Sequence, residues 1–388
     1  MKNILFVSHS AELNGAERML LQTLRRIDKK KFSPHLILPQ PGPLYKEAEK
    51  LRIKVTIISS KWWLTEKKKA WIQPFSWMWN LGSVIRICEV IRQENISLVF
   101  SNSSADFSGA WAAKLMGIPH LWSIHEILSG PDPLISFLLG HRILARLISV
   151  LSTRIMVNSR ATQKSFGGER KLRLVYNGLD TDFENQDFDE AGREEFGFED
   201  EDFLIGVVGK IYSQKGQKEV MLAVASLRRS YPQVKLLVVG EAKEKKYYEH
   251  LRRWIKEKGL ERHIHFTGYR KDVSHVLRLM DLLVVSSWVD SFGLAALEAM
   301  AVKTPVLAVK AGGLPEIIHD RINGFLVDSA HPEMIRRALE DILQNPLRMD
   351  DVAQTGYHAV RERFSFKDKI KKIEEILDEC FKQDAERA

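Results

Sequence analysis

The sequence predicts an α/β protein built from two doubly wound, Rossmann-like domains that face a central cleft. The chain has 388 residues, enough for two domains that each bury a substantial core. Short apolar segments rich in β-branched residues recur along it, and each precedes a segment with helical periodicity. The alternation stops over an acidic stretch at 180–202 and then restarts, which indicates a boundary between two similar domains.

The first half contains seven expected strands. They are Ile4–Val7, Leu36–Leu38, Val55–Ile58, Leu98–Phe100, His120–Ile124, Ile155–Val157 and Leu172–Val175. Helical periodicity occurs at Ala16–Ile27, Trp79–Gln93, Ala105–Met116 and Pro133–Leu151. Strands that alternate with helices in this way are expected to be parallel and buried on both faces.

The second half repeats the pattern with six expected strands, at Phe203–Val208, Val234–Val239, Ile264–Phe266, Leu282–Val285, Val306–Val309 and Phe325–Val327. Helices follow from about His331, and an amphipathic helix runs from Lys367 to about Glu386. We therefore divide the chain into domains at 1–177 and 178–366, with a helix at 367–388 that packs back toward the N-terminal domain.

Composition limits the classes of protein that fit. The two cysteines, Cys88 and Cys380, have no partners at metal-binding spacing, so neither a disulfide framework nor a zinc site is expected. The N-terminus does not have the form of a signal peptide, and basic residues interrupt the apolar stretch Leu134–Leu151, so we expect a cytoplasmic protein without a membrane span. Residues 1–177 contain 26 Lys and Arg against 12 Asp and Glu, and this positive half suits a phosphate, an anionic membrane or nucleic acid.

Two expected strands end in loops that suit an anion. The loop after Phe203–Val208 contains Lys210 and Lys215 before a helix at Gln217, and both side chains could reach a diphosphate; the alternative is two solvated surface lysines. In the first half, Gly15 lies at a helix start where backbone N–H groups are exposed. The alternative there is an ordinary strand-to-helix turn.

The segment after Leu282–Val285 carries the most information about chemistry. Asp290 precedes an expected helix, and Glu298 lies about two helical turns further on. The amides that begin this helix suit phosphate or sugar oxygens, and they belong to Ser291, Phe292, Gly293 and Leu294. A carboxylate within the helix suits the two hydroxyls of a ribose. The alternative is an acidic helix start with a surface glutamate.

Further motifs follow in a fixed order. They are Glu298-Ala299-Met300, Pro305-Val306, Gly312-Gly313-Leu314-Pro315-Glu316 and Asn323-Gly324-Phe325. Together with Asp290 and Glu298 they make the region from Gly209 to Val327 resemble the donor domain of family 4 glycosyltransferases, which have the two-domain GT-B fold. Looser matches in the first half are Asn14-Gly15-Ala16-Glu17, His125, Asn158-Ser159 and Asn177-Gly178. The resemblance therefore spans essentially the whole chain.

The resemblance implies roles for individual residues. It implies that Lys210 and Lys215 hold the donor diphosphate and that Glu298 binds the ribose. It also implies that Asp290 and the amides after it bind the transferred sugar, with Gly15 closing over the phosphates. His125 would lie beside the donor sugar, whereas its spacing alone favours a core or supporting histidine. The catalytic candidates are thus His125, Lys210, Lys215 and Asp290.

Two departures from the family pattern concern these residues. Lys210 stands where the family usually has Arg, so the charge remains but the bidentate fork is lost. Asp290 stands where the family usually has Glu, and its shorter side chain leaves the identity of the sugar open. The resemblance implies retention of anomeric configuration, with neither a protein nucleophile nor a metal. Asp180-Thr181-Asp182 looks like a metal-binding Asp-x-Asp but does not follow a donor-site strand, so we expect no metal and no other cofactor.

An insert rich in tryptophan and lysine precedes the second expected helix. It includes Trp62, Trp63, Lys67, Lys68, Lys69 and Trp71. Tryptophan favours the headgroup region of a bilayer and lysine favours an anionic leaflet, so we predict a loop that docks on membrane and meets a lipid acceptor. The alternative is that the tryptophans pack beneath the insert and the lysines are solvated. Nucleic acid is not expected, because no recognised nucleic-acid-binding module surrounds the aromatic residues.

The predicted function is therefore a retaining glycosyltransferase that uses a nucleotide diphosphate sugar, with UDP as the expected nucleotide. The N-terminal domain would bind the acceptor and the C-terminal domain the donor. The expected acceptor is a lipid-linked glycan or envelope polysaccharide at the inner face of the membrane. A soluble sugar, sugar phosphate or polyol acceptor is the alternative within the same chemistry. A non-catalytic sugar-nucleotide or glycan-binding protein and a nucleotide-sugar epimerase are the alternatives outside it.

Overall fold

The computed structural model describes residues 1–388 except 66–70, 129–135, 168–169, 181–182, 184–191 and 387–388. The chain divides into two compact units. Unit 1 comprises Met1–Asn177 together with Lys367–Ala388, and unit 2 comprises Gly178–Phe366. The chain thus leaves unit 1 after Asn177 and returns to it at Lys367.

Unit 1 is built on a parallel sheet of seven strands in the order β3-β2-β1-β4-β5-β6-β7. Their bounds are β1 Lys2–Ser8, β2 Phe32–Leu38, β3 Lys54–Ile57, β4 Leu98–Asn102, β5 His120–Ile124, β6 Arg154–Val157 and β7 Leu172–Leu174. Residues in the central strand β1, such as Leu5 and Phe6, are fully buried. A parallel sheet covered on both faces requires such continuous apolar strands, and the order places the polar ends of β1, β4 and β5 side by side.

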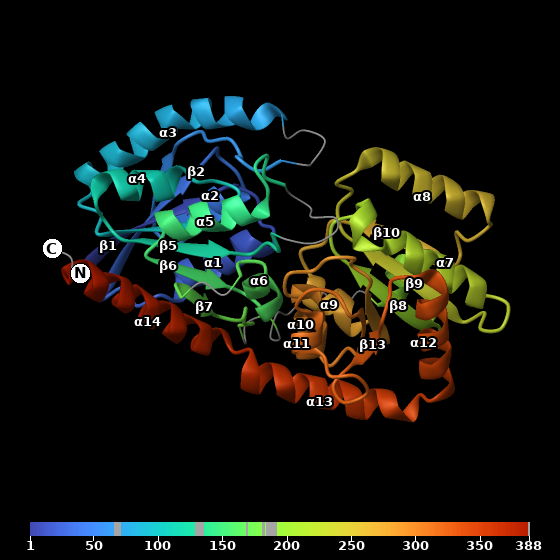
Figure 1. Cartoon of the computed structure of the whole chain (residues 1–388). Coiled ribbons are helices and arrows are strands. Elements are labelled where there is room, and N and C mark those ends of the chain that lie inside the picture. The colour runs from blue at the N-terminus through green and yellow to red at the C-terminus, as the bar shows by residue number, and fades with distance from the viewer. Residues whose placement is uncertain (66–70, 129–135, 168–169, 181–182, 184–191, 387–388) are drawn as a thin grey trace. The chain divides into compact units, whose positions relative to one another are not determined.

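Helices cover both faces of this sheet (Figure 1). Their bounds are α1 Gly15–Arg26, α2 Pro43–Lys50, α3 Gln73–Gln93, α4 Ser108–Met116, α5 His141–Leu151, α6 Arg160–Lys164 and α14 Phe366–Ala385. Apolar residues of α3, α4 and α5 form the core on one face. Met19 of α1 and Lys369 of α14 lie over the other, next to Phe100 of β4.

The C-terminal helix α14 is tied to unit 1 by charged side chains. Glu379 accepts hydrogen bonds from Arg154 of β6 and Arg173 of β7, both at 2.8 Å. Glu374 accepts a hydrogen bond of 2.9 Å from the backbone N–H of Asp28. The apolar face of α14 is buried, with Ile373 and Leu377 at 0% exposure. The helix is therefore an integral part of unit 1.

Unit 2 is built on a six-stranded parallel sheet in the order β10-β9-β8-β11-β12-β13. Its strands are β8 Phe203–Val208, β9 Val234–Val239, β10 Ile264–Gly268, β11 Leu282–Val285, β12 Val306–Val309 and β13 Phe325–Val327. Its helices are α7 Gln217–Leu227, α8 Lys245–Glu257, α9 Val273–Arg278, α10 Leu294–Ala301, α11 Leu314–Ile317, α12 Pro332–Gln344 and α13 Leu347–Arg363. Residues of α7, α8 and α12 form one large core with the sheet (Figure 1). All strands expected in both halves are thus present.

Two helices differ from expectation. Helix α3 begins at Gln73 and not at Trp79, with Pro74 in its first turn, where proline is well tolerated. For the helix expected over Pro133–Leu151, residues 133–135 lie outside the described residues, and the helix itself begins at His141, since Ser136 forms an antiparallel bridge with Thr65. This pairing is between residues far apart in the chain, so local periodicity does not report it.

Candidate functional site

The loop between β8 and α7 holds the two predicted lysines at the carboxyl end of the unit 2 sheet. Gly216, just before α7, has a φ of 71°, and a Cβ there would lie 2.2 Å from the carbonyl oxygen of Ser286. The hydroxyl of Ser286 donates a hydrogen bond of 3.0 Å to the carbonyl of Lys215. Gln217 is buried, and its amide donates to the carbonyl of Lys210 at 2.9 Å. These contacts fix the loop against the end of β11.

Lys215 and Asp290 form an ion pair within this site. The Nζ of Lys215 lies 3.1 Å from Oδ2 of Asp290. Burial favours the neutral amine, but attraction to Asp290 and to the hydroxyl of Tyr212 outweighs it and raises the pKa of Lys215. Lys215 therefore carries a full positive charge at neutral pH, with 27% of its side chain exposed.

Asp290 also organises the start of α10. Its Oδ1 accepts a hydrogen bond of 3.2 Å from the N–H of Phe292, and its carbonyl accepts one of 2.9 Å from the N–H of Gly313. Gly313 must be small, because a Cβ would lie 2.6 Å from the carbonyl oxygen of Ser291. The loops after β11 and β12 are thus packed backbone to backbone at one place.

Three further predicted donor residues, Gly293, Leu294 and Glu298, lie at the start of helix α10 or within it. Gly293 has a φ of 98° and precedes Leu294, the first residue of α10. Glu298 lies in the second turn of α10, and only 3% of it is exposed. The structure therefore brings Lys215, Asp290 and the start of α10 together, with Glu298 on the same helix. Lys210 lies on the same β8–α7 loop as Lys215.

A second polar cluster lies at the carboxyl end of the unit 1 sheet. His125 directly follows β5, and its Nε2 lies 2.9 Å from Oδ1 of Asn102, the last residue of β4. Because an amide oxygen only accepts, Nε2 carries the hydrogen. Burial lowers the pKa of His125 to about 4, so the ring is neutral at physiological pH.

Glu126 lies next to His125 and is held by two serines. Ser103 donates its hydroxyl to Oε1 of Glu126, and the N–H and hydroxyl of Ser104 lie 3.1 and 2.9 Å from Oε2. Burial opposes its ionisation, but the neighbouring histidines and these hydrogen bonds lower the pKa of Glu126. The carboxylate therefore stays charged beside a neutral imidazole.

Sequence reasoning missed several members of this cluster. Asn102 contacts His125 through its side chain and His9 through its carbonyl, at 3.2 Å from Nδ1. His9 in turn lies 3.3 Å from the buried carboxylate of Glu17. The sequence does contain a signal that predicts this cluster. Polar residues lie at or directly after the ends of β1, β4 and β5, and adjacent parallel strands bring the residues at their carboxyl ends together. Gly15, the first residue of α1, lies two residues before Glu17, and its role toward phosphate stays a prediction.

The tryptophan residues of the insert separate into buried and exposed ones. Trp63 is 3% exposed, packs against Phe107 and donates its indole N–H to the carbonyl of Ser104. The expectation that Trp63 contacts a membrane is therefore wrong, because its side chain completes the unit 1 core. Trp62 is 46% exposed and Trp71 is 68% exposed. Lys67, Lys68 and Lys69 lie outside the described residues.

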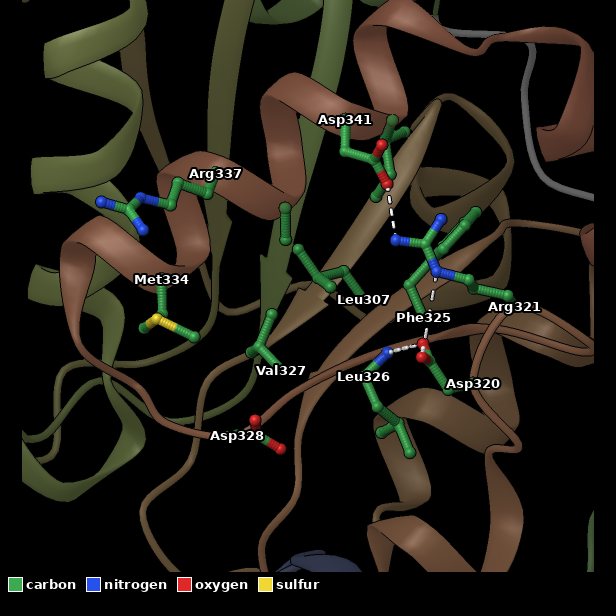
Figure 2. A pocket seen from close by; sticks show the side chains of 12 residues that line it. Leu307, Asp320, Arg321, Phe325, Leu326, Val327, Asp328, Met334, Arg337 and Asp341 are labelled. Carbon is green, nitrogen blue, oxygen red and sulfur yellow. Dashed lines mark hydrogen bonds and ion pairs between the residues drawn. The ribbon is translucent and has the colours of Figure 1, made fainter.

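Unit 2 also has a pocket of about 240 Å³ between β13 and α12, away from the predicted donor residues (Figure 2). Its charged groups are paired with one another or with charged residues next to the pocket. Arg321 lies 2.9 Å from Asp341, and Asp320 accepts a hydrogen bond from the N–H of Leu326. Arg337 is paired with Glu333. With its charges already paired and no predicted site residue in its lining, this pocket has no assigned role.

Two family models match the chain, one over each half. Residues 13–183 match Glycosyltransferase Family 4, and residues 188–359 match Glycosyl transferases group 1. This chain belongs to the family 4 glycosyltransferases. Its fold is the GT-B fold of that family, as the two parallel sheets indicate.

Individual relatives agree with this membership, and a solved structure shares the fold. A D-inositol 3-phosphate glycosyltransferase of Segniliparus rotundus is 28% identical over 72% of this chain and 66% of its own length. The putative glycosyltransferase EpsD of Bacillus subtilis is 30% identical over 48% of this chain and 47% of its own. The crystal structure of Anabaena Alr3699/HepE in complex with UDP and glucose has a TM-score of 0.81 at 23% identity, and the match covers 97% of this chain and 100% of that one.

Within the ranges that the structure describes, none of the helices combines the length and hydropathy needed to cross a membrane.

Proposed function

We propose that the protein is a retaining glycosyltransferase that transfers a sugar from a nucleotide diphosphate donor, UDP-sugar in the first instance, to a lipid-linked glycan or envelope polysaccharide. Family membership supports the reaction class. The observation that carries the proposal is the charged Lys215 held beside Asp290 and the amides that begin α10.

The chemistry needs such an arrangement. Cleavage of the anomeric C–O bond puts negative charge on the departing diphosphate and positive charge on the sugar. Lys215, Lys210 and the N–H groups at the start of α10 would stabilise the diphosphate in a partly buried setting, where such contacts are strong. Glu298 would bind the ribose hydroxyls. The acceptor hydroxyl would attack the same face of the sugar, and an oxygen of the departing phosphate would take its proton, so the step needs neither a protein nucleophile nor a metal.

A donor panel tests this proposal. The purified chain is offered UDP-, GDP- and ADP-sugars without added metal, and nucleotide release is followed with and without a membrane lipid extract. We expect turnover of one donor that increases with the extract. Absence of turnover with every donor, together with absence of binding in calorimetry, would contradict a transferase.

The first turns of α3 support a membrane-bound acceptor, because their polar side chains are buried and their apolar side chains are exposed. Asn80 is buried and exchanges hydrogen bonds with the backbone of Lys61, at 2.8 and 2.7 Å. Gln73 is also buried, and its amide oxygen accepts from the N–H of Leu138. The outward residues Phe75 and Met78 are instead apolar, with 63% and 66% of each exposed.

This part of α3, with the preceding Trp71, forms what we call the α3 face. It consists of Trp71, Phe75, Met78 and Trp79. Lys61 lies 4.3 Å above the ring of Trp79, so a cation borders this apolar surface. Aromatic and basic groups side by side suit the interface of an anionic bilayer. We propose that this face replaces the predicted Trp63-containing loop as the membrane contact.

Vesicle sedimentation tests the α3 face. Phosphatidylglycerol vesicles are compared with phosphatidylcholine vesicles, using the wild-type chain and the double variant Phe75→Ser with Met78→Ser. We expect the double variant to bind phosphatidylglycerol vesicles about tenfold more weakly, because two apolar side chains no longer enter the bilayer. Tyr269→Ser, at an exposed aromatic residue of unit 2, is the matched control. Unchanged sedimentation of the double variant would favour a soluble acceptor.

A further inference from the structure

His9 is a histidine at the carboxyl edge of the unit 1 sheet that the proposed donor chemistry does not use. It directly follows β1. Its Nδ1 lies 3.2 Å from the carbonyl oxygen of Asn102 and 3.3 Å from Oε1 of Glu17. The carbonyl oxygen of Asn102 can only accept a hydrogen bond, so Nδ1 carries the hydrogen. In the neutral ring, Nε2 is therefore left with a lone pair that can accept a hydrogen bond from a hydroxyl.

Glu17 lies at ion-pair distance from this imidazole. Its carboxylate is 1% exposed and lies in the first turn of α1. Burial raises the pKa of Glu17. Asn102 adds a second constraint, because its carbonyl faces His9 while its side chain holds His125. His9 is thus held in a defined place next to the histidine that the family resemblance places beside the donor sugar.

Trp62 provides a flat apolar surface against His9. The two ring centroids are 5.3 Å apart, and the indole N–H donates a hydrogen bond of 3.0 Å to the carbonyl oxygen of His9. The polar atom of the indole is therefore satisfied, yet 46% of the residue is exposed. A tryptophan anchored in this way keeps a rigid ring available to a ligand. Sugar rings present C–H groups on one face, which pack well on such a ring.

We propose that Trp62 and His9 recognise a sugar of the acceptor. The Trp62 ring packs on the C–H face of the sugar, Nε2 of His9 accepts a hydrogen bond from one of its hydroxyls, and Glu17 is a positioning residue for His9. This inference rests on the proposed function and specifies its acceptor as a carbohydrate at the point of contact. It assigns Trp62 to the acceptor and leaves the membrane contact to the α3 face.

Steady-state kinetics with simple glycosides test the assignment. The n-octyl glycosides of glucose, galactose, mannose and N-acetylglucosamine serve as acceptors at a saturating concentration of the donor found in the panel. Hydrolysis of the same donor without acceptor reports the donor site separately. We expect Trp62→Ala to raise the KM for the glycoside about tenfold and to leave acceptor-free hydrolysis within about twofold of wild type. Trp62→Phe, which retains a flat ring, should show a smaller increase. Trp111→Ala, at another half-exposed tryptophan, is the matched control.

The two amide replacements of His9 separate recognition from simple support. His9→Gln places a polar atom near the position of Nε2, whereas His9→Asn places one near Nδ1. Recognition through Nε2 predicts that the Gln variant retains a lower KM for the glycoside than the Asn variant. Glu17→Gln should raise the same KM by less than His9→Ala does, without changing acceptor-free hydrolysis.

Three outcomes would overturn the inference. The first is a lower KM for the glycoside in His9→Asn than in His9→Gln. The second is a loss of transfer in the Trp62 and His9 variants that is matched by an equal loss of acceptor-free hydrolysis. The third is a wild-type chain that hydrolyses its donor but accepts none of the four glycosides. If the wild-type chain neither binds nor hydrolyses any donor, the proposed function itself has failed, and this result is distinct from the other three.

Discussion

The two sheets end in polar loops at their carboxyl edges, but their ionisable groups are held in different charge states. In unit 2, attraction to Asp290 outweighs burial and raises the pKa of Lys215. In unit 1, burial lowers the pKa of His125 to about 4 and that of Lys369 to about 7. One edge therefore presents a fixed cation, which suits a diphosphate, and the other presents a neutral imidazole at His125, which suits a hydroxyl. The same strand topology serves both, because the chemistry lies in the residues that follow the strands.

Among tests of the difference between the two sheet edges, we expect the largest effect from Lys215→Ala. Removing the partly buried cation takes away stabilisation of the departing diphosphate, so we expect kcat/KM for the donor to fall about 10²–10³-fold. Acceptor-free hydrolysis of the donor should fall by the same factor. Lys218→Ala, on an exposed side chain of α7, is the control. A Lys215→Ala variant with near wild-type hydrolysis would show that the fixed cation is not part of the donor site.

A stability experiment sharpens the comparison of the partly buried Lys215 with the buried Lys369. Lys369 is 4% exposed, and its Nζ donates a hydrogen bond of 2.9 Å to Oδ1 of Asn177. Burial lowers its pKa from 10.5 to about 7 in the folded chain, so between these pH values the unfolded chain binds more protons. The lowered pKa of Lys369 should therefore make the free energy of unfolding rise with pH above about 7, by up to roughly 1.4 kcal/mol per pH unit. This gain should be absent below about pH 7.

Urea unfolding at pH 7 and pH 9 measures this difference. We expect the wild-type chain to gain about 2 kcal/mol relative to Lys369→Met over this interval. Lys371→Met, at an exposed position of the same helix, should follow the wild-type pH dependence. Parallel pH profiles for the wild-type chain and Lys369→Met would show that Lys369 keeps its charge in the folded state, as Lys215 does.

The smallest expected effect concerns His125 at the carboxyl edge of the unit 1 sheet. With a pKa of about 4, His125 should stay uncharged from about pH 5 to pH 8, so its ionisation should not shape the pH profile of transfer there. His125→Gln should lower kcat about tenfold through a lost hydrogen bond and leave the shape of that profile unchanged. An acid limb near pH 6.5 that disappears in His125→Gln would show that the ring titrates normally.

The sequence by itself determined which residues of unit 2 are candidates for the donor site and which strands they follow. Lys210, Lys215, Asp290 and Glu298 belong to short motifs that directly follow apolar strands, and both the strand periodicity and the motif spacing are local properties of the chain. The same local signals placed all the strands and most helix positions. Only the tertiary structure decided that Trp63 lies in the core while Trp62 remains half exposed, because neighbouring residues after a strand have no fixed periodicity.

The unit 1 cluster likewise depended on tertiary structure. His9, Asn102 and His125 come from the ends of three strands separated by long stretches of sequence, and they meet only because β1, β4 and β5 are adjacent in the sheet. The burial of polar side chains in the first turns of α3 has a similar origin, since Asn80 and Gln73 face inward to bond with distant backbone groups. Burial and hydrogen bonding across the chain set the contacts of these residues and the associated pKa shifts, and local periodicity in the sequence encodes neither.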